Sequence, residues 1–257
     1  MFNLSDDNLI RLVVFGLEIS FTFSLIYWIR LSSPTHKQSW RFFANLLVWG
    51  GVAAVIAAYV ELTYSFNIPE IQAKSPALVV HYGTWYEMIN NASASLIEEL
   101  AKYTVAVFTI LNSRQVRKLS DAIVYLILIG LGFSLIEDII FLLNPDTVAP
   151  YRLLSFYVHS GTSAVIGYSL GRYMSGVARY PELLIAILGA IGLHFAYNLS
   201  TTLQDGHYSF YLTIAITVYI SLQIFILFRK AIEEEYRLGH RFRAATTQKL
   251  LNLTPSK

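Results

Sequence analysis

The chain of 257 residues contains no cysteine. Without thiols it can form neither a disulfide framework nor an iron–sulfur site, and it has no cysteine nucleophile. Charged residues are also scarce, because Asp, Glu, Lys and Arg make up only 14% of the chain, against roughly 25% in an ordinary soluble domain. The net charge of +2 is too small to indicate a nucleic-acid partner. These absences argue against a soluble, disulfide-bonded or nucleic-acid-binding protein.

Hydrophobic residues are abundant: they form 55% of the chain, and the mean hydropathy is +0.50. An apolar run of roughly 20 residues can cross the hydrocarbon core of a bilayer as a helix. Such runs occur at about 9–31, 40–66, 91–111, 121–143, 151–174, 181–201 and 208–229. We therefore expect an all-α, polytopic membrane bundle of about seven transmembrane helices. It would form one transmembrane domain over 1–230, followed by a charged tail over 231–257.

Basic residues predict the orientation of the bundle. Short loops rich in Lys and Arg face the cytoplasm, and alternate loops of this chain are rich and poor in them. The N-terminus carries Asp6 and Asp7 and is poor in basic residues. The basic loops contain Arg30, Lys37, Arg41, Arg114, Arg117, Lys118, Arg172 and Arg179. The pattern predicts an outer N-terminus and a cytoplasmic C-terminus.

Four of the predicted spans contain ionisable side chains, which are costly inside a bilayer and therefore mark functional sites. A rise of ~1.5 Å per residue places these groups ~10–12 Å from the outer membrane boundary. We expect them to meet at one level in the outer half of the membrane. With one asparagine beside them, they are Glu98, Glu99, Lys102, Glu137, Asp138, His159, His194 and Asn198.

The spacing of these residues indicates shared helix faces. Glu98 and Lys102 are four residues apart, as are His194 and Asn198, and residues at that spacing lie on one side of a helix. In a confined, partly wet site, a carboxylate beside His or Lys can remove a proton from water. Imidazole and amide N–H groups can stabilise the oxyanion of a tetrahedral intermediate. The set therefore suits hydrolysis without a covalent nucleophile.

Small residues accompany the two histidines. They include Ser160, Gly161, Thr162, Ser163, Gly167 and Gly171 after the first histidine, and Gly189 and Gly192 before the second. Small side chains allow membrane helices to approach closely. We expect close helix packing in both predicted spans, which would hold the polar groups rigidly.

The order of the polar segments resembles a known family. The segments are Glu98-Glu99-Leu100-Ala101-Lys102, Gly132-Phe133-Ser134-Leu135-Ile136-Glu137-Asp138, His159, and His194-Phe195-Ala196-Tyr197-Asn198. They resemble the successive motifs of the PrsW family of intramembrane proteases, which is related to the type II CAAX prenyl proteases and the wider glutamic intramembrane protease group. The resemblance covers about 90–200, so this part would form the protease core.

The resemblance implies a role for each matching residue. Glu98 would activate the water, Glu99 would support it, and His159 would bind or orient it. His194 and Asn198 would stabilise the oxyanion. Lys102 would serve as a counter-charge, and Glu137 fits the second motif, in which Asp138 stands where many members carry Asn.

The resemblance also implies a substrate and a location. It suggests a multi-pass protein of the bacterial cytoplasmic membrane, a glutamic-type peptide hydrolase that needs no cofactor. The substrate would be a single-span membrane protein, for instance an anti-sigma factor, cut near the extracytoplasmic face. The lipid bilayer would be its surroundings, with no nucleic-acid partner.

Three alternatives stay open. Zinc held by Glu98, His159 and His194 would leave a coordination position for water. Intramembrane carboxylates and histidines also line the pathways of proton- or ion-coupled transporters, and a catalytically silent scaffold would keep the same helices.

The outer loop predicted over 67–90 contains an apolar stretch, 77–86, that would either lie in the membrane interface or cover the site.

Overall fold

The computed structural model describes residues 39–64, 74–112, 116–143, 154–202 and 206–238, together with most positions between 13 and 27. These residues contain α-helices and no strands, which confirms the all-α prediction. The described positions between 13 and 27 are helical as well. The helices are α2 (Trp40–Tyr64), α4 (Pro76–Asn112), α5 (Leu119–Leu142), α6 (Ser155–Met174), α7 (Tyr180–Thr202) and α8 (Gly206–Leu238).

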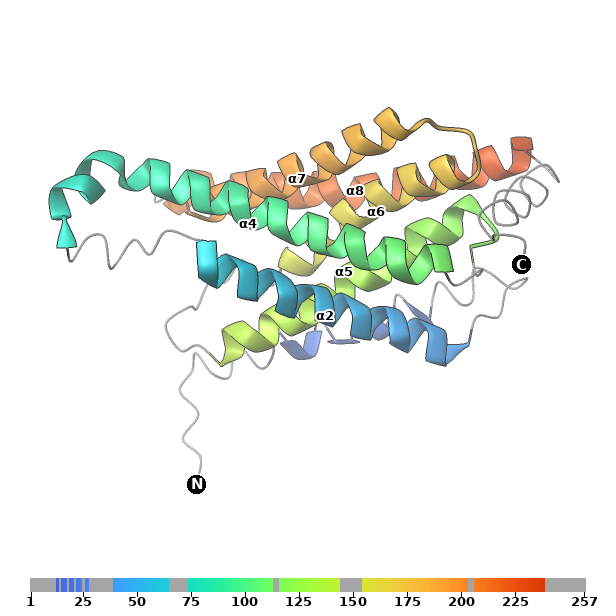
Figure 1. Cartoon of the computed structure of the whole chain (residues 1–257), viewed down its shortest axis with the longest axis horizontal. Helices are drawn as coiled ribbons and strands as arrows, with labels where there is room; N and C mark the ends of the chain where they lie inside the picture. Colours follow the sequence, from blue (N-terminus) through green and yellow to red (C-terminus); the bar gives the residue numbers. More distant parts are fainter. Residues whose placement is uncertain are drawn as a thin grey trace, which may run out of the picture.

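Helix α5 is deeply buried in the bundle. It packs against α2, α4 and α6, while α7 packs against α4, α6 and α8. Figure 1 shows these helices running along the long axis of the molecule. Because α5 is covered on several sides, its sequence is hydrophobic almost all round, as expected for a helix inside a bundle. Its fully buried side chains include Leu119, Ile123, Tyr125, Leu126, Leu128, Ile129 and Leu131.

Four described helices are long and apolar enough to cross a membrane: Trp40–Tyr64, Leu119–Ile140, Tyr180–Thr202 and Tyr208–Leu238. Large apolar side chains such as Val48, Ile185 and Phe225 are exposed on them, as is normal for surfaces that face lipid. The chain is therefore a helical membrane bundle. Helices α4 and α6 fall outside this set because they carry more of the polar residues. The predicted number of seven spans and the orientation stay predictions.

The loop predicted over 67–90 is wrong for residues 76–90, which are helical. Helix α4 begins at Pro76 and runs without a break into the third predicted span, and its N-terminal end extends beyond the end of α2 (Figure 1). Proline at the first position of a helix loses no intrahelical hydrogen bond, so Pro76 starts the helix instead of interrupting it. Residues 67–73 lie outside the described part of the chain.

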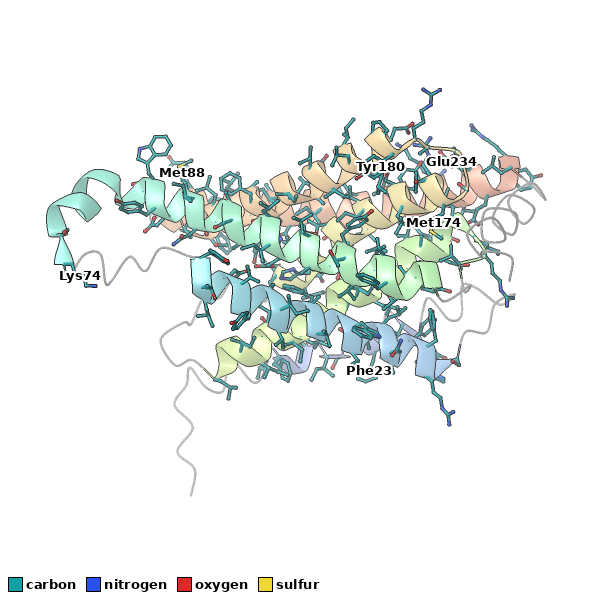
Figure 2. All side chains as sticks on the ribbon, in the orientation of Figure 1. Phe23, Lys74, Met88, Met174, Tyr180 and Glu234 are labelled. Atoms are coloured by element: carbon teal, nitrogen blue, oxygen red, sulfur yellow. The ribbon has the colours of Figure 1, made fainter. Side chains whose placement is uncertain are left out.

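Several basic residues of the described part of the chain lie at one end of the bundle. Figure 2 shows Lys74 and Met88 towards one end of the long axis and Met174, Tyr180 and Glu234 towards the other. At this second end, Arg172 forms ion pairs of 3.3 Å with Glu182 and 3.2 Å with Glu234. Arg117, Lys118 and Arg179 also lie in the connections at this end. The described basic residues Arg117, Lys118, Arg172 and Arg179, which help to predict the cytoplasmic side, thus share one end.

Helix α8 continues past the predicted start of the tail at 231. It stays helical to Leu238 and is anchored to the bundle by polar contacts. Tyr168 donates a hydrogen bond of 2.9 Å to Glu234, and the backbone N–H of Ser120 donates one of 2.6 Å to Glu235. The remainder of the tail, 239–257, lies outside the described residues.

Glycines allow α5 to approach its neighbours closely. A Cβ atom at Gly132 would collide with the backbone carbonyl of Leu47 on α2, and one at Gly167 would lie 2.8 Å from the carbonyl oxygen of Ala122. The close packing predicted for the small residues of α6 is confirmed at Gly167. It is wrong for Gly189 and Gly192 on α7, where an added Cβ would meet nothing within 4 Å.

This contrast yields a test of the packing. Gly132→Ala forces the α2 and α5 backbones apart, so we expect it to destabilise the protein by about 1–3 kcal/mol, the usual cost of overpacking. The loss would appear as a lower Tm in detergent. Gly189→Ala is the matched control: its new methyl group enters open space and should leave the Tm unchanged or slightly raised. Equal Tm values for the two variants would contradict the packing described here.

Candidate active site

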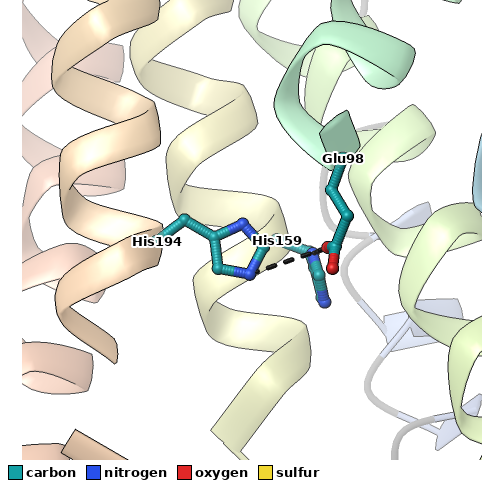
Figure 3. Close-up of side chains that lie close together, drawn as sticks. All are labelled: Glu98, His159 and His194. Atoms are coloured by element: carbon teal, nitrogen blue, oxygen red, sulfur yellow. Dashed lines mark ion pairs between the residues drawn. The ribbon is translucent and has the colours of Figure 1, made fainter. Parts of the chain in front are cut away.

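Four helices bring polar side chains together inside the bundle. Glu98 comes from α4, Glu137 from α5, His159 from α6 and His194 from α7. Figure 3 shows Glu98, His159 and His194 converging from three separate helices. Glu98 is 6% exposed and each histidine 2%, whereas the side chain of Glu137 is 19% exposed. The site is therefore nearly closed, with Glu137 on its more open side.

The centre of the site is a triangle of three atoms. Glu98 Oε2 lies 3.8 Å from His159 Nδ1 and 3.7 Å from His194 Nε2. Each of the three residues has a ligand atom that lies within 4.8 Å of those of the other two. Both measured distances are too long for direct hydrogen bonds, and Glu98 Oε2 accepts none from any described residue. The three atoms face a common point without bonding to each other.

A carboxylate orients each histidine through the ring nitrogen that does not face Glu98. His159 Nε2 lies 2.7 Å from Glu137 Oε2, and His194 Nδ1 lies 2.8 Å from Glu99 Oε1. An ionised carboxylate only accepts hydrogen bonds, so we assign the proton to the ring nitrogen in each pair. In a neutral imidazole the other nitrogen then carries a lone pair. His159 Nδ1, His194 Nε2 and Glu98 Oε2 are therefore three acceptors pointing at one place.

Glu99 is held by two further donors. Lys102 Nζ donates to Glu99 Oε1 at 2.6 Å, and Thr162 Oγ1 donates to the same oxygen at 2.9 Å. Lys102 is completely buried, and its Nζ also lies 3.2 Å from His159 Nδ1. A buried ammonium needs such a counter-charge. Glu99 and Lys102 therefore form a fixed pair that supports both histidines.

The charges of the site do not balance among these residues. Glu98, Glu99 and Glu137 are three carboxylates, while Lys102 is one ammonium. With neutral imidazoles the formal charge is −2, and unbalanced charge inside a bilayer is expensive. Either a divalent cation or protons would compensate for it.

The residues fit a divalent metal ion. Two histidines and a glutamate are an established zinc donor set, with the remaining coordination position left for water. Zinc ligands ~2.0–2.2 Å from the ion in a tetrahedral arrangement lie ~3.3–3.6 Å apart, whereas two atoms that bind the same water lie ~4.5 Å apart. The distances of 3.7 and 3.8 Å are closer to the first value. Histidine ligands also typically donate their other N–H to a carboxylate, as both do here.

The structure brings together most of the residues predicted from the sequence. Asn198 lies one turn beyond His194 on α7, where its side-chain N–H donates to Ser95 Oγ at 3.1 Å. Asp138 is buried and follows Glu137 in α5. The residues that form the triangle or contact its histidines are Glu98, Glu99, Lys102, Glu137, His159 and His194.

Sequence reasoning missed two polar residues near the site, Thr162 and Ser95. It assigned Thr162 to small-residue packing, although its position three residues after His159 places it on the same side of α6. Ser95 lies four residues before Glu99 on α4 and therefore shares its face. Spacing from the ionisable residues was the signal for both.

Comparison with known proteins identifies the family. The model of the PrsW family intramembrane metalloprotease matches residues 38–228. No curated protein and no solved structure matches the chain. The family match includes the site residues of α4, α5, α6 and α7 and extends well beyond the region about 90–200 that carries the motifs. The chain belongs to the PrsW family of intramembrane metalloproteases.

Proposed function

We propose that the chain is an endopeptidase that cuts membrane-anchored proteins at a centre formed by Glu98, His159 and His194. One observation carries the proposal: three atoms with lone pairs converge from three helices. Glu98 Oε2 lies 3.8 Å from His159 Nδ1 and 3.7 Å from His194 Nε2. These residues would hold a divalent cation, which supplies Lewis-acid chemistry for hydrolysis. The family match supports the proteolytic reaction in general.

The surrounding residues prepare this centre. Glu137 and Glu99 each accept a ring N–H, which fixes the tautomer and aims the opposite nitrogen at the centre. Lys102 and Thr162 hold Glu99 in place through its Oε1 atom. Because Glu99 is itself held by two donors, the imidazole of His194 cannot turn freely. Such preorganisation is what a site needs to stabilise a transition state.

A metal-free mechanism, the one predicted from the sequence, uses the same residues. Glu98 would take the proton of the attacking water as a general base, and His159 would orient that water. The ammonium of Lys102 at 3.2 Å from His159 Nδ1 supports this alternative, since it is a donor to one of the three lone pairs. Asn198 would then complete an oxyanion site with His194.

We further propose that the cut lies on the extracytoplasmic side. His159 is four residues from the start of α6, and Glu137 is five residues from the end of α5, so both lie ~6–8 Å from those helix ends. Arg172 lies in the last turn of α6, at the end opposite to His159, and Arg179 directly precedes the start of α7. By the positive-inside rule those basic ends are cytoplasmic, with the N-terminus outside.

The substrate class follows from the position of the centre. A site inside the membrane would act on a segment that enters the bilayer, and a single-span protein is the simplest such substrate. A membrane-anchored anti-sigma factor in a bacterial cytoplasmic membrane fits this description. A transporter is less well supported because the next buried residues on the inner side of the site, Ala106 and Ile110 on α4, are apolar.

The experiment uses purified protein in lipid nanodiscs with a panel of labelled single-span proteins. We expect at least one of them to be cut into two fragments. Failure to cut any of them, together with proton uptake into liposomes that contain the protein, would favour a transporter. Failure in both assays would favour the silent scaffold.

A further inference from the structure

A row of polar contacts joins α4 and α7 on one side of the site. Asn91 Nδ2 donates to Thr202 Oγ1 at 3.2 Å, and Asn198 Nδ2 donates to Ser95 Oγ at 3.1 Å. The partners recur every four residues on each helix, so they form a straight line between antiparallel helices. We name these contacts the polar seam; its three pairs are Asn91–Thr202, Ser95–Asn198 and Glu99–His194.

Exposure falls steadily along the polar seam. Thr202 is exposed, Asn91 and Asn198 are half-buried, and Ser95 and Glu99 are completely buried. The seam therefore begins at the surface near the outer end of α7 and ends at the site. From Asn91 to Glu99 it covers eight residues of α4, or ~12 Å along the helix.

Within the described parts of α4 and α7, the polar seam lies on one side of the site. On the cytoplasmic side, the buried residues of α7 in the same line are Ala190, Ile187 and Leu183. The corresponding residues of α4 are Ala106 and Ile110. If the polar pairs only held two helices together, they would have no reason to stop at the site. A polar seam on one side of the site suits the entry of a small polar molecule from the outer surface.

We propose that the polar seam carries water from the extracytoplasmic surface to the Glu98 centre. The proposal rests on the proposed function, because hydrolysis consumes one water for each peptide bond: its oxygen joins the new carboxyl group and its hydrogens are shared between the products. On α4 and α7, the buried side chains on the other side of the site, such as Ala106 and Ala190, offer no hydrogen bonds to water. The Asn198 amide offers two N–H groups and a carbonyl, and the bond to Ser95 uses one N–H.

The absence of cysteine makes a direct test simple, since a single introduced thiol is the only one in the protein. Ser95→Cys is nearly isosteric and places a thiol in the polar seam. Ala106→Cys is the matched control: it is on the same helix and equally buried, at 0% exposure, but on the cytoplasmic side of the site. Both variants are reconstituted in vesicles and treated from the extracytoplasmic side with a small, charged methanethiosulfonate.

We expect Ser95→Cys to react at least ~10-fold faster than Ala106→Cys, because the thiolate that reacts needs a hydrated environment. After denaturation in detergent both variants should react completely with the same reagent, which shows that both thiols are intact. Asn91→Cys, nearer the surface, should react faster than either and serves as the second variant if Ser95→Cys does not fold. Equal, slow reaction of Ser95→Cys and Ala106→Cys would overturn the proposal, as would reaction of Ser95→Cys only from the cytoplasmic side.

The labelling does not depend on proteolysis. It is repeated with Glu98→Gln added to the Ser95→Cys and Ala106→Cys variants. This change leaves the polar seam intact and alters the proposed reaction centre. If Ser95→Cys is labelled in chains with Glu98 intact and those chains cleave no substrate, the water path stands and only the proposed function is contradicted. If Ser95→Cys reacts slowly in a protein that cleaves its substrate, the proposed water path is contradicted and the proposed function stands.

Discussion

Replacing Glu98 by glutamine should lower kcat/KM for substrate cleavage by ~10²–10⁴-fold, the usual contribution of a positioned acid–base group. Glutamine has the same size, so the fold should be retained. Among the residues that the structure describes, the change removes the one carboxylate oxygen that lies within 4 Å of both histidines, at 3.8 and 3.7 Å. It therefore removes a metal ligand in one mechanism and the general base in the other. The measurement is cleavage of a labelled single-span substrate by purified protein.

Glu87→Gln is the matched control for this variant. Glu87 lies on the same helix, about three turns before Glu98, and is half-buried, but it does not belong to the site. The same change of charge there should leave kcat/KM within about twofold, as for substitutions away from a functional site. If Glu98→Gln cleaves as fast as Glu87→Gln, the reaction does not take place at the triangle.

Removing divalent metal should reduce cleavage to the level of the Glu98→Gln variant. The reason is the charge and the donor set of the site: three lone pairs converge, and the carboxylates exceed the ammonium groups by two. Dialysis against a zinc chelator should abolish the activity, and added zinc should restore it, because binding depends on the free ion. The same chelator saturated with zinc is the control for non-specific effects.

The metal content of the dialysed protein is measured in the same samples. Full activity in protein that contains less than about a tenth of an ion per chain would contradict the metal site. It would support the metal-free mechanism, in which Glu98 acts on water directly. The two mechanisms share their residues, so only this measurement separates them.

The sequence predicts helices that the structure describes and polar residues that it brings close together, for a physical reason. Ionisable side chains are rare in apolar helices because they are costly there, so Glu98, His159 and His194 stand out against their surroundings. Their expected depth comes from the helical rise and the predicted ends of the spans. The result is a candidate site drawn from four helices before any contact is known.

The roles of adjacent residues were harder to predict. Glu98 and Glu99 are neighbours in the chain, yet successive helical residues point ~100° apart. Glu98 faces the centre, while Glu99 turns towards Lys102, Thr162 and His194. Which of the two glutamates faces the centre depends on how α4 is rotated about its own axis. That rotation cannot be read from one sequence.

Packing and helix ends show the same limit. Gly167 and Gly189 look equivalent in the sequence, but only Gly167 lies against another backbone. Pro76 reads as a break between two spans, although proline is also well suited to the first turn of a helix. In both cases the residue type permits two structures, and the neighbouring helix determines which one forms.

The most direct test of the reaction centre is to map the cut by mass spectrometry in oxygen-18 water, with wild-type protein and Glu98→Gln in nanodiscs. The account predicts that wild type cuts a single-span substrate within the outer half of its span and that the new carboxyl group carries one oxygen-18 atom. Glu98→Gln should give no such product. A cut outside the membrane, or the same labelled product from Glu98→Gln, would contradict hydrolysis at the centre formed by Glu98, His159 and His194.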